Sequence, residues 1–291
     1  MEPIKRLRSV HLATPELEAS TAFYTAGFGL RARGERDGVR AFSGARSEDA
    51  VLRLEAADRP RMVGLTFALA DAAALARARE ALGAAGLEAG AGDPDDASGA
   101  SFSVTDPDGR RIAFAVDAGA PDEAPVEDGR PLFVSHAVLN SPDAPRLSAF
   151  YTATLGLGLA DRYEKGLLDF LRVDQPQHHC LGVSPAERAS LNHFSVDVGS
   201  IDALMRGIGR MKQAGHEPIW GPGRHGPGGN VFCYFEDPAG FVAELTCEVG
   251  KIADDAAWEA KEWPRVPEVA NVWLTGGPTP RAIALMGGEA Q

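Results

Sequence analysis

The sequence predicts an α+β fold of two domains, each built from a pair of βαβββ modules. The chain has 291 residues, which is enough for about two domains with separate cores. Its halves repeat one plan of short strands and helices, and the strand segments alternate apolar and polar residues as half-buried antiparallel sheet does. We expect domains over residues 1–120 and 132–250, and an extension over residues 251–291.

The repeat appears in short matching segments. Each half begins with a strand that carries one His, continues with a helix that contains Ala-Phe-Tyr-Thr-Ala, and ends with an Asp-Pro-x-Gly turn and a strand. The segments are His11, residues 22–26 and residues 106–109 in the first half, and His136, residues 149–153 and residues 237–240 in the second. Self-similarity over the length of a domain indicates a duplicated folding unit.

A second strand and helix follow within each half. The strands contain Thr66 and His193, and the helices are predicted over residues 72–85 and 201–214. Ser200 is a good N-cap for the later helix, and Gly215 is a good residue to end it. Paired modules of this kind predict curved sheets that enclose a cavity.

The composition limits the partners. A net charge of −12 argues against nucleic acid or an anionic membrane, because both favour basic surfaces. Neither a signal peptide nor a run of 18 apolar residues is apparent. The three cysteines lack metal-binding spacing and indicate reduced thiols in the cytoplasm.

The extension differs in amino-acid composition from the two halves. It contains Trp258, Trp263 and Trp273 and several prolines. We expect the tryptophans to pack on the body of the protein or on a neighbouring subunit, and we expect a homo-oligomer.

Three residues of the second half predict a metal site. His136 lies on the first strand of one module, His193 on the first strand of the next, and Glu244 on the final strand. First strands of paired modules lie side by side, so these residues can meet. Two imidazoles and one carboxylate bind non-haem Fe(II) and leave positions open for other ligands, and Mn(II) accepts the same set.

The first half serves as an internal control. When the first half is aligned with the second, His11, Thr66 and Ala113 stand at the positions of His136, His193 and Glu244. Only His11 is still a residue of the type predicted to bind the metal. The first half is therefore expected to have the fold without the site. Taken singly, each His also fits an ordinary core or surface histidine.

The chain resembles the two-domain type I extradiol ring-cleavage dioxygenases of the vicinal oxygen chelate superfamily, over about residues 5–250. The motif that carries the resemblance is Gly-x-His, Tyr, Asp-Pro-x-Gly and Glu, met by Gly223-Arg224-His225, Tyr234, residues 237–240 and Glu244. Cys233 departs from it, since a larger residue usually precedes the Tyr. Cys is a small hydrophobe, so the departure concerns pocket packing.

The resemblance implies Fe(II) held by the three predicted ligands, and cleavage by O2 of a catechol next to its two hydroxyls, in the breakdown of aromatic compounds. It implies that His178, not His179, is the acid–base group, and that His225 and Tyr234 hydrogen-bond the substrate or oxygen. In an extended segment neighbours face opposite ways, so at most one of His178 and His179 is expected to face the cavity. The substrate pocket is expected to be lined by Val138, Phe170 and His179.

Two other functions remain open. Relatives with the same modules include metal-dependent enzymes that do not use O2, such as glyoxalases, epimerases and thiol transferases. They lack the arrangement of His178, His225 and Tyr234. A non-catalytic binding protein of this fold is the third possibility, and it is expected to have lost the ligands in both halves.

Overall fold

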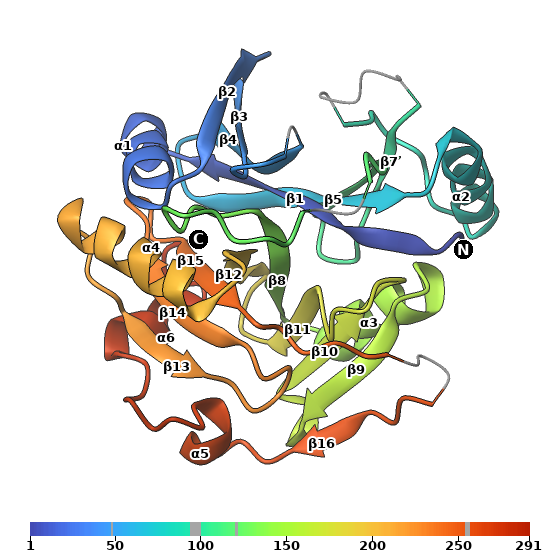
Figure 1. The fold of residues 1–291 in the computed structure, drawn as a ribbon. Helices are drawn as coiled ribbons and strands as arrows, with labels where there is room; N and C mark the ends of the chain where they lie inside the picture. The colour runs from blue at the N-terminus through green and yellow to red at the C-terminus, as the bar shows by residue number, and fades with distance from the viewer. Residues whose placement is uncertain (48, 94–99, 120–121, 254–256) are drawn as a thin grey trace.

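The computed structural model contains two β-sheets that lie one above the other (Figure 1). It describes all residues except 48, 94–99, 120–121 and 254–256, so parts of the segment between the two predicted domains and of the predicted extension lie outside the described residues. The first sheet consists of β1 (Ile4–Thr14), β2 (Arg31–Arg36), β3 (Val39–Ser43), β4 (Ala50–Ala56), β5 (Arg61–Leu69), β6 (Phe102–Thr105) and β7 (Arg111–Val116). The second consists of β8 (Phe133–Ser141), β9 (Gly158–Tyr163), β10 (Leu168–Arg172), β11 (Leu181–Pro185), β12 (Ser190–Asp197), β13 (Trp220–Arg224), β14 (Val231–Glu236), β15 (Val242–Cys247) and β16 (Lys261–Trp263).

The strand order confirms the α+β prediction and the duplication. The first sheet runs β2-β3-β4-β1-β5-β7-β6, and the second runs β13-β14-β15-β12-β8-β11-β10-β9-β16. In each sheet the first strands of the two modules are antiparallel neighbours at the centre, β1 with β5 and β8 with β12. Each of these four central strands also pairs in parallel with one strand of its own module: β1 with β4, β5 with β7, β8 with β11 and β12 with β15.

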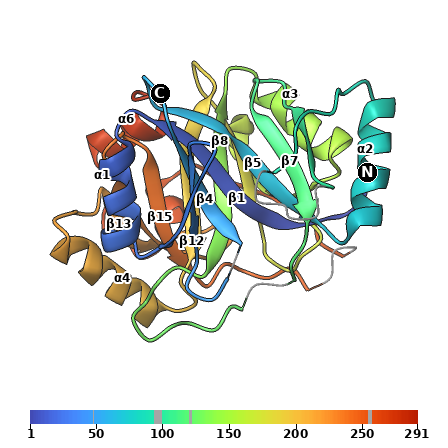
Figure 2. The same cartoon turned by 90° about the horizontal axis from the view of Figure 1, so that it is seen from above.

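The helices flank the sheets at two ends, with α1 over α4 at one end and α2 over α3 at the other (Figures 1 and 2). The α-helices are α1 (Leu17–Ala22), α2 (Ala72–Ala84), α3 (Ala144–Ala149), α4 (Ile201–Gln213), α5 (Pro267–Ala270) and α6 (Pro280–Met286). The predicted helices α2 and α4 are confirmed, and the Ser200 hydroxyl accepts a hydrogen bond from the backbone N–H of Ala203 as an N-cap does. The repeated Phe-Tyr-Thr segments form π-helical turns, η1 (Phe23–Gly27) and η2 (Phe150–Thr154). A short 3₁₀ turn, η3 (Glu164–Gly166), follows β9.

Strand alternation gives the second sheet two different faces. On β15, Ala243 and Leu245 belong to a large core that extends into the first sheet, whereas Glu244 faces the other way. On β14, Phe235 joins that core, whereas Tyr234 belongs to a separate cluster on the opposite face. The face away from the first sheet therefore carries the residues that the sequence predicts as functional.

The repeated motifs connect the two halves. The Tyr24 hydroxyl in the first half donates a hydrogen bond to Asp237 in the second, at 3.0 Å. Reciprocally, the Tyr151 hydroxyl in the second half donates to Asp106 in the first, at 3.2 Å. All four residues are buried. In each pair, the Tyr of the Ala-Phe-Tyr-Thr-Ala segment in one copy thus binds the Asp of the Asp-Pro-x-Gly turn in the other copy.

The extension covers the site face of the second sheet. Its strand β16 pairs in parallel with β9 at the sheet edge. Leu285 of α6 packs in the cluster that contains Phe232 and Tyr234, and the indole N–H of Trp258 donates to the carbonyl of Ala160 at 2.6 Å. Two of the tryptophans, Trp258 and Trp263, therefore contact the body of the chain, and Figure 1 shows β16, α5 and α6 on the side away from the first sheet.

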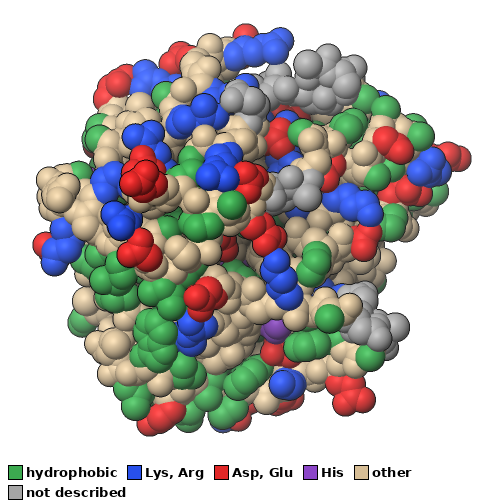
Figure 3. All heavy atoms as spheres, viewed as in Figure 1, with side chains coloured by type: hydrophobic (Ala, Val, Ile, Leu, Met, Phe, Trp, Pro, Cys, Tyr) green, Lys and Arg blue, Asp and Glu red, His purple; other side chains and the backbone are tan. Residues whose placement is uncertain are grey.

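Figure 3 shows acidic and basic side chains interspersed over the face drawn there, without a continuous basic patch on it. None of the helices in the described part of the chain has the length and apolar character that crossing a membrane needs.

Removing the hydroxyl of Tyr24 tests the connection between the halves. We expect Tyr24→Phe to lower the free energy of unfolding by about 1–3 kcal/mol, because the buried Asp237 carboxyl loses a donor. Tyr151→Phe is expected to act in the same direction through Asp106. Urea denaturation of both variants measures the effect, and two midpoints equal to that of the wild type would contradict it.

Candidate metal centre

His136, His193 and Glu244 come together on three adjacent strands of the second sheet. His136 lies on β8, His193 on β12 and Glu244 on β15, and their ligand atoms all lie within 4.8 Å of one another. The side-by-side placement predicted for the first strands is confirmed by the pairing of β8 with β12. All three side chains are buried, and Glu244 is 0% exposed.

One atom of each residue points to a common centre. Oε2 of Glu244 lies 2.9 Å from Nε2 of His136 and 3.5 Å from Nε2 of His193, and the two Nε2 atoms are 3.4 Å apart. Two ligands each about 2.1 Å from one ion are about 3.0 Å apart at a right angle and about 3.4 Å apart at a tetrahedral angle. The observed separations match that range.

The other ring nitrogens have fixed partners. Nδ1 of His193 lies 2.8 Å from the side-chain oxygen of Asn192, which assigns the proton to Nδ1 and leaves Nε2 free. Nδ1 of His136 lies 3.1 Å from the Ser135 hydroxyl, which in turn accepts from Gln177. Such outer partners orient the imidazoles that hold a metal.

The carboxylate is also oriented from outside the cluster. Asn230 donates to Oε1 of Glu244 at 3.3 Å and to the Thr246 hydroxyl at 2.9 Å. Oε2 is buried and makes no hydrogen bond of good geometry. Burial alone would raise the pKa of Glu244, but the neighbouring His136 outweighs it and holds this pKa below its ordinary value.

The residues fit a divalent metal. Burial lowers the pKa of His193 to about 3, so this imidazole is neutral near pH 7 and offers a lone pair. A buried carboxylate oxygen without a hydrogen bond needs a positive charge to compensate its desolvation. Two neutral imidazoles and one carboxylate supply three ligands and leave the remaining positions open.

His225 and Tyr234 form a hydrogen-bonded pair beside the cluster. Nε2 of His225 lies 2.9 Å from the Tyr234 hydroxyl, and the Tyr234 ring stands edge-on to His193 at 5.1 Å between centroids. Nδ1 of His225 lies 2.7 Å from the carbonyl oxygen of Ala270, which can only accept. The proton of a neutral His225 is therefore on Nδ1, and Nε2 accepts from Tyr234.

The structure places His179, rather than His178, next to the metal cluster. The ring of His179 lies 4.7 Å from that of His136, whereas His178 packs against Trp258 at 5.7 Å and hydrogen-bonds Asp161. This differs from the orientation that the resemblance implied. Strand alternation does not decide it, because both residues lie in the irregular segment between β10 and β11. Burial lowers the pKa of His179 well below its ordinary value.

The predicted pocket residues lie on the same face. Phe170 is buried and its ring lies 5.0 Å from that of His179. Val138 is buried and pairs with His193 across β8 and β12. Two further aromatic residues, which the sequence does not single out, lie near His225: Phe232 stacks on His225 at 3.9 Å, and Trp220 stacks on Tyr234 at 5.2 Å.

The strand register corrects the alignment of the two halves. The hydroxyls of Thr14 and Ser141 each accept from the backbone N–H two residues later, which marks these positions as equivalent. Counting back from them places Ser9, not His11, at the position of His136. The parallel pairs Thr66–Ala113 in the first sheet and Ser195–Glu244 in the second also correspond, so Ala113 is equivalent to Glu244. Gly64, two residues before Thr66, is then equivalent to His193, two residues before Ser195.

It follows that the positions of the three predicted ligands are held by Ser9, Gly64 and Ala113 in the first half. None of these is a metal ligand of the required type. Gly64 lies so close to the backbone of Arg111 that a Cβ atom would sit 1.9 Å from its carbonyl oxygen. A His at position 64 would require the strands to move apart, so this register excludes the site from the first half.

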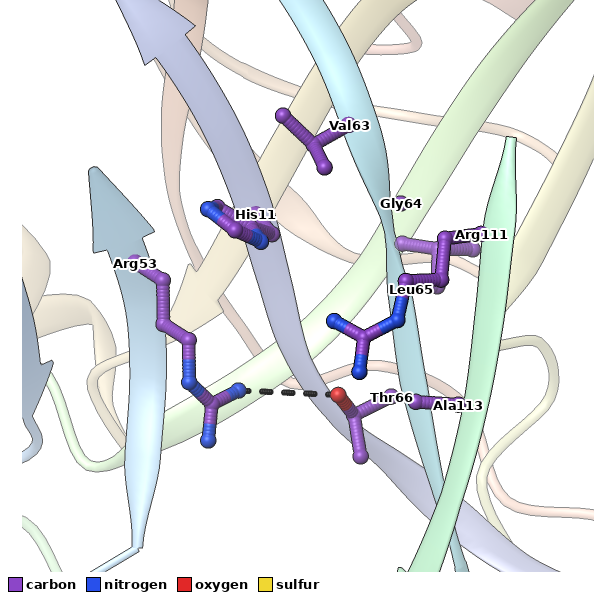
Figure 4. A pocket seen from close by; sticks show the side chains of 8 residues that line it. All are labelled: His11, Arg53, Val63, Gly64, Leu65, Thr66, Arg111 and Ala113. Carbon is purple, nitrogen blue, oxygen red and sulfur yellow. Dashed lines mark hydrogen bonds between the residues drawn. The ribbon is translucent and has the colours of Figure 1, made fainter. Parts of the chain in front are cut away.

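A guanidinium fills the corresponding place. Arg53 donates to the hydroxyl of Ser9 and, at 2.7 Å, to the carboxylate of Asp93. Figure 4 shows Arg53 of β4 reaching across β1 toward Thr66 of β5. The space left there is about 10 Å³, room for about one water molecule. The strand pairings place Gly182 opposite Val138 where Arg53 lies opposite His11. The second half therefore has no guanidinium at this position, and the side chains of Val138 and Leu168 pack against Gly182 instead.

The chain belongs to the Glyoxalase/Bleomycin resistance protein/Dioxygenase superfamily, whose model matches residues 6–114 and 134–245. The match covers both halves and agrees with the duplication. It confirms the fold and the superfamily that the sequence resemblance predicted.

Two named relatives, a metapyrocatechase and a trihydroxybiphenyl dioxygenase, match part of the chain. The chain is 30% identical to Metapyrocatechase 2 from Cupriavidus necator over 50% of this chain and 45% of that protein. It is 28% identical to 2,2',3-trihydroxybiphenyl dioxygenase from Sphingomonas paucimobilis over 43% of this chain and 44% of that protein. The matches thus span less than half the length of these two relatives.

Solved structures share the whole fold. The Mn(II)-bound glyoxalase from Novosphingobium aromaticivorans is 28% identical with a TM-score of 0.83, covering 97% of this chain and 94% of that chain. Homoprotocatechuate 2,3-dioxygenase from Arthrobacter globiformis is 17% identical with a TM-score of 0.81, covering 95% and 89%. The second likeness concerns the fold alone.

Glu244→Ala tests the cluster as a metal centre. We expect this variant to lose stoichiometric binding of Fe(II) and Mn(II), because only two neutral imidazoles remain. Metal content after anaerobic loading and desalting is the measurement. Glu248→Ala, which removes a partly exposed carboxylate that pairs with Arg224, is the control. Full metal content in Glu244→Ala would refute Glu244 as a ligand.

Proposed function

We propose that the protein is an extradiol dioxygenase that uses Fe(II) and O2 to cleave a catechol next to its two hydroxyls. The observation that carries the proposal is the second layer of groups around His136, His193 and Glu244. On one side stands the His225–Tyr234 pair, and on another stands His179. A metal centre that only binds a ligand does not need proton-transfer groups on two sides.

His136, His193 and Glu244 would hold Fe(II), which would bind the diol and O2 and lower the pKa of the diol. The chain's own residues then handle the protons. The Tyr234 oxygen can accept the proton that the diol loses, as the Tyr234 hydroxyl proton passes to Nε2 of His225. Burial lowers the pKa of His225, so the pair starts neutral and can release the proton later.

His179 is the second proton-transfer group of the proposal, in place of His178. Its ring is buried, close to His136 and bordered by Phe170. The lowered pKa of His179 keeps its imidazole neutral, so it can accept a proton from a reacting oxygen beside it and return it to the product. The aromatic walls given by Phe170, Phe232 and Trp220 suit a flat aromatic substrate.

The test of the function is anaerobic loading with Fe(II), followed by exposure to air with a panel of monocyclic and bicyclic catechols. We expect O2 uptake in a one-to-one ratio with substrate and a yellow ring-opened product. Loading with Mn(II) in a parallel sample identifies the active metal. Absence of product from every catechol in protein with full metal content would contradict the proposal.

A second candidate function is a metal-dependent reaction without O2. It is favoured by the likeness to the Mn(II)-bound glyoxalase, which covers nearly all of both chains. The same metal-loaded protein distinguishes the two, because a glyoxalase-type enzyme would convert a 2-oxoaldehyde and thiol mixture without O2 uptake. Turnover of that mixture under nitrogen, with no catechol cleaved in air, would favour this function.

Replacing His179 separates binding from proton transfer. We expect His179→Asn to keep its metal and bind catechol with KM within about threefold of the wild type, while kcat falls by about 10²–10⁴-fold. Metal analysis and steady-state O2 uptake measure the two effects. His216→Asn, which lies against Phe23 far from the cluster, is the control. An unchanged kcat in His179→Asn would remove this residue from the mechanism.

A further inference from the structure

A chain of hydrogen bonds leads from His179 away from the metal cluster. Nδ1 of His179 lies 3.0 Å from Nδ1 of His178, and Nε2 of His178 lies 3.1 Å from Oδ2 of Asp161. The three residues are 3%, 4% and 1% exposed. A buried row of two imidazoles and one carboxylate is costly to desolvate unless its members satisfy one another.

The C-terminal extension holds the outer end of this row. The backbone N–H of Lys261 donates to Oδ1 of Asp161 at 2.8 Å, and the indole N–H of Trp263 donates to Oδ2 at 2.7 Å. The ring of Trp258 packs edge-on against His178 at 5.7 Å. Burial opposes ionisation of Asp161, but the hydrogen bonds from His178, Lys261 and Trp263 outweigh it and hold the pKa of Asp161 below its ordinary value.

The ionised carboxylate fixes the direction of each hydrogen bond. Because Asp161 can only accept, Nε2 of His178 carries a proton and donates it. A neutral His178 then has a bare Nδ1, which accepts from Nδ1 of His179. A neutral His179 therefore carries its proton on Nδ1, and its Nε2 is unprotonated. Among the residues that the structure describes, this Nε2 has no hydrogen-bond partner.

We propose that His178 and Asp161 are positioning residues that hold His179 in the Nδ1-protonated form, with Nε2 ready to accept a proton. The extension completes this relay of His179, His178 and Asp161 through Lys261 and Trp263. The role in turnover rests on the proposed function; the proton arrangement does not. The carboxylate would also stabilise the cation that His179 becomes when Nε2 gains a proton, as charge-assisted hydrogen bonds do.

The alternative placement of the protons begins with a doubly protonated His178. This residue would donate from both nitrogens, and the neutral His179 would then carry its proton on Nε2. This placement would make Nε2 of His179 a donor at the start of the reaction. The two arrangements differ in which nitrogen of His179 is protonated, so they can be separated without metal or substrate.

The first experiment is ¹⁵N NMR of the metal-free full-length protein labelled at histidine, with resonances assigned from His178→Gln and His179→Asn. We expect Nδ1 of His179 and Nε2 of His178 to be protonated at neutral pH. In Asp161→Asn we expect this preference to be lost, while Asp169→Asn, on the neighbouring strand β10, keeps it. A wild-type His179 protonated on Nε2 would overturn the proposal, even if the Asp161 variant fails to fold.

The second experiment uses Fe(II)-loaded protein. We expect Asp161→Asn to retain metal and KM but to lose about 10–100-fold in kcat. Trp263→Phe, which keeps a ring but removes the donor to Asp161, is expected to lower kcat less and in the same direction.

The outcomes separate the relay from the function. Catechol cleavage with unchanged kcat in Asp161→Asn would refute the relay and leave the function standing. The expected NMR pattern in a protein that cleaves no catechol would refute the function and leave the proton arrangement standing.

Discussion

The fully buried carboxylate of Glu244 is the constraint around which the second half is organised. An ionised group without access to water is tolerated only when positive or donor groups surround it. Asn230 supplies a donor to one oxygen, and two Nε2 atoms converge on the other, which lacks a good hydrogen bond. A divalent ion at that centre would compensate the charge and use the lone pairs of His136 and His193.

The two halves show how one fold gains or loses this site. In the second half the strands bring two imidazoles to the carboxylate, Gly182 carries no guanidinium toward them, and the extension covers the face. In the first half Gly64 approaches the backbone of Arg111 too closely for any side chain, and the Arg53 guanidinium fills the place. The fold is therefore common to both halves, and the chemistry depends on a few side chains.

Much of this could be predicted from the sequence, and the rest depended on three-dimensional pairing. The duplication, the helices α2 and α4 and the convergence of His136, His193 and Glu244 followed from periodicity and repeated motifs. The correspondence of His11 with His136 was wrong by two residues, because short strands look alike until their partners fix the register. The order of His178 and His179 failed because they lie outside regular strand. The contacts of Ala270 and Trp263 join segments about 45 and 100 residues apart, for which no local pattern exists.

The most direct measurement is anomalous diffraction at the iron edge from crystals of the Fe(II)-loaded protein, grown and soaked with a catechol under nitrogen. The account predicts one iron bound by Nε2 of His136, Nε2 of His193 and Oε2 of Glu244. Both diol oxygens should lie on it, with the ring between the Tyr234 and His179 sides. Iron at another place, or a catechol that binds away from the iron, would contradict the account.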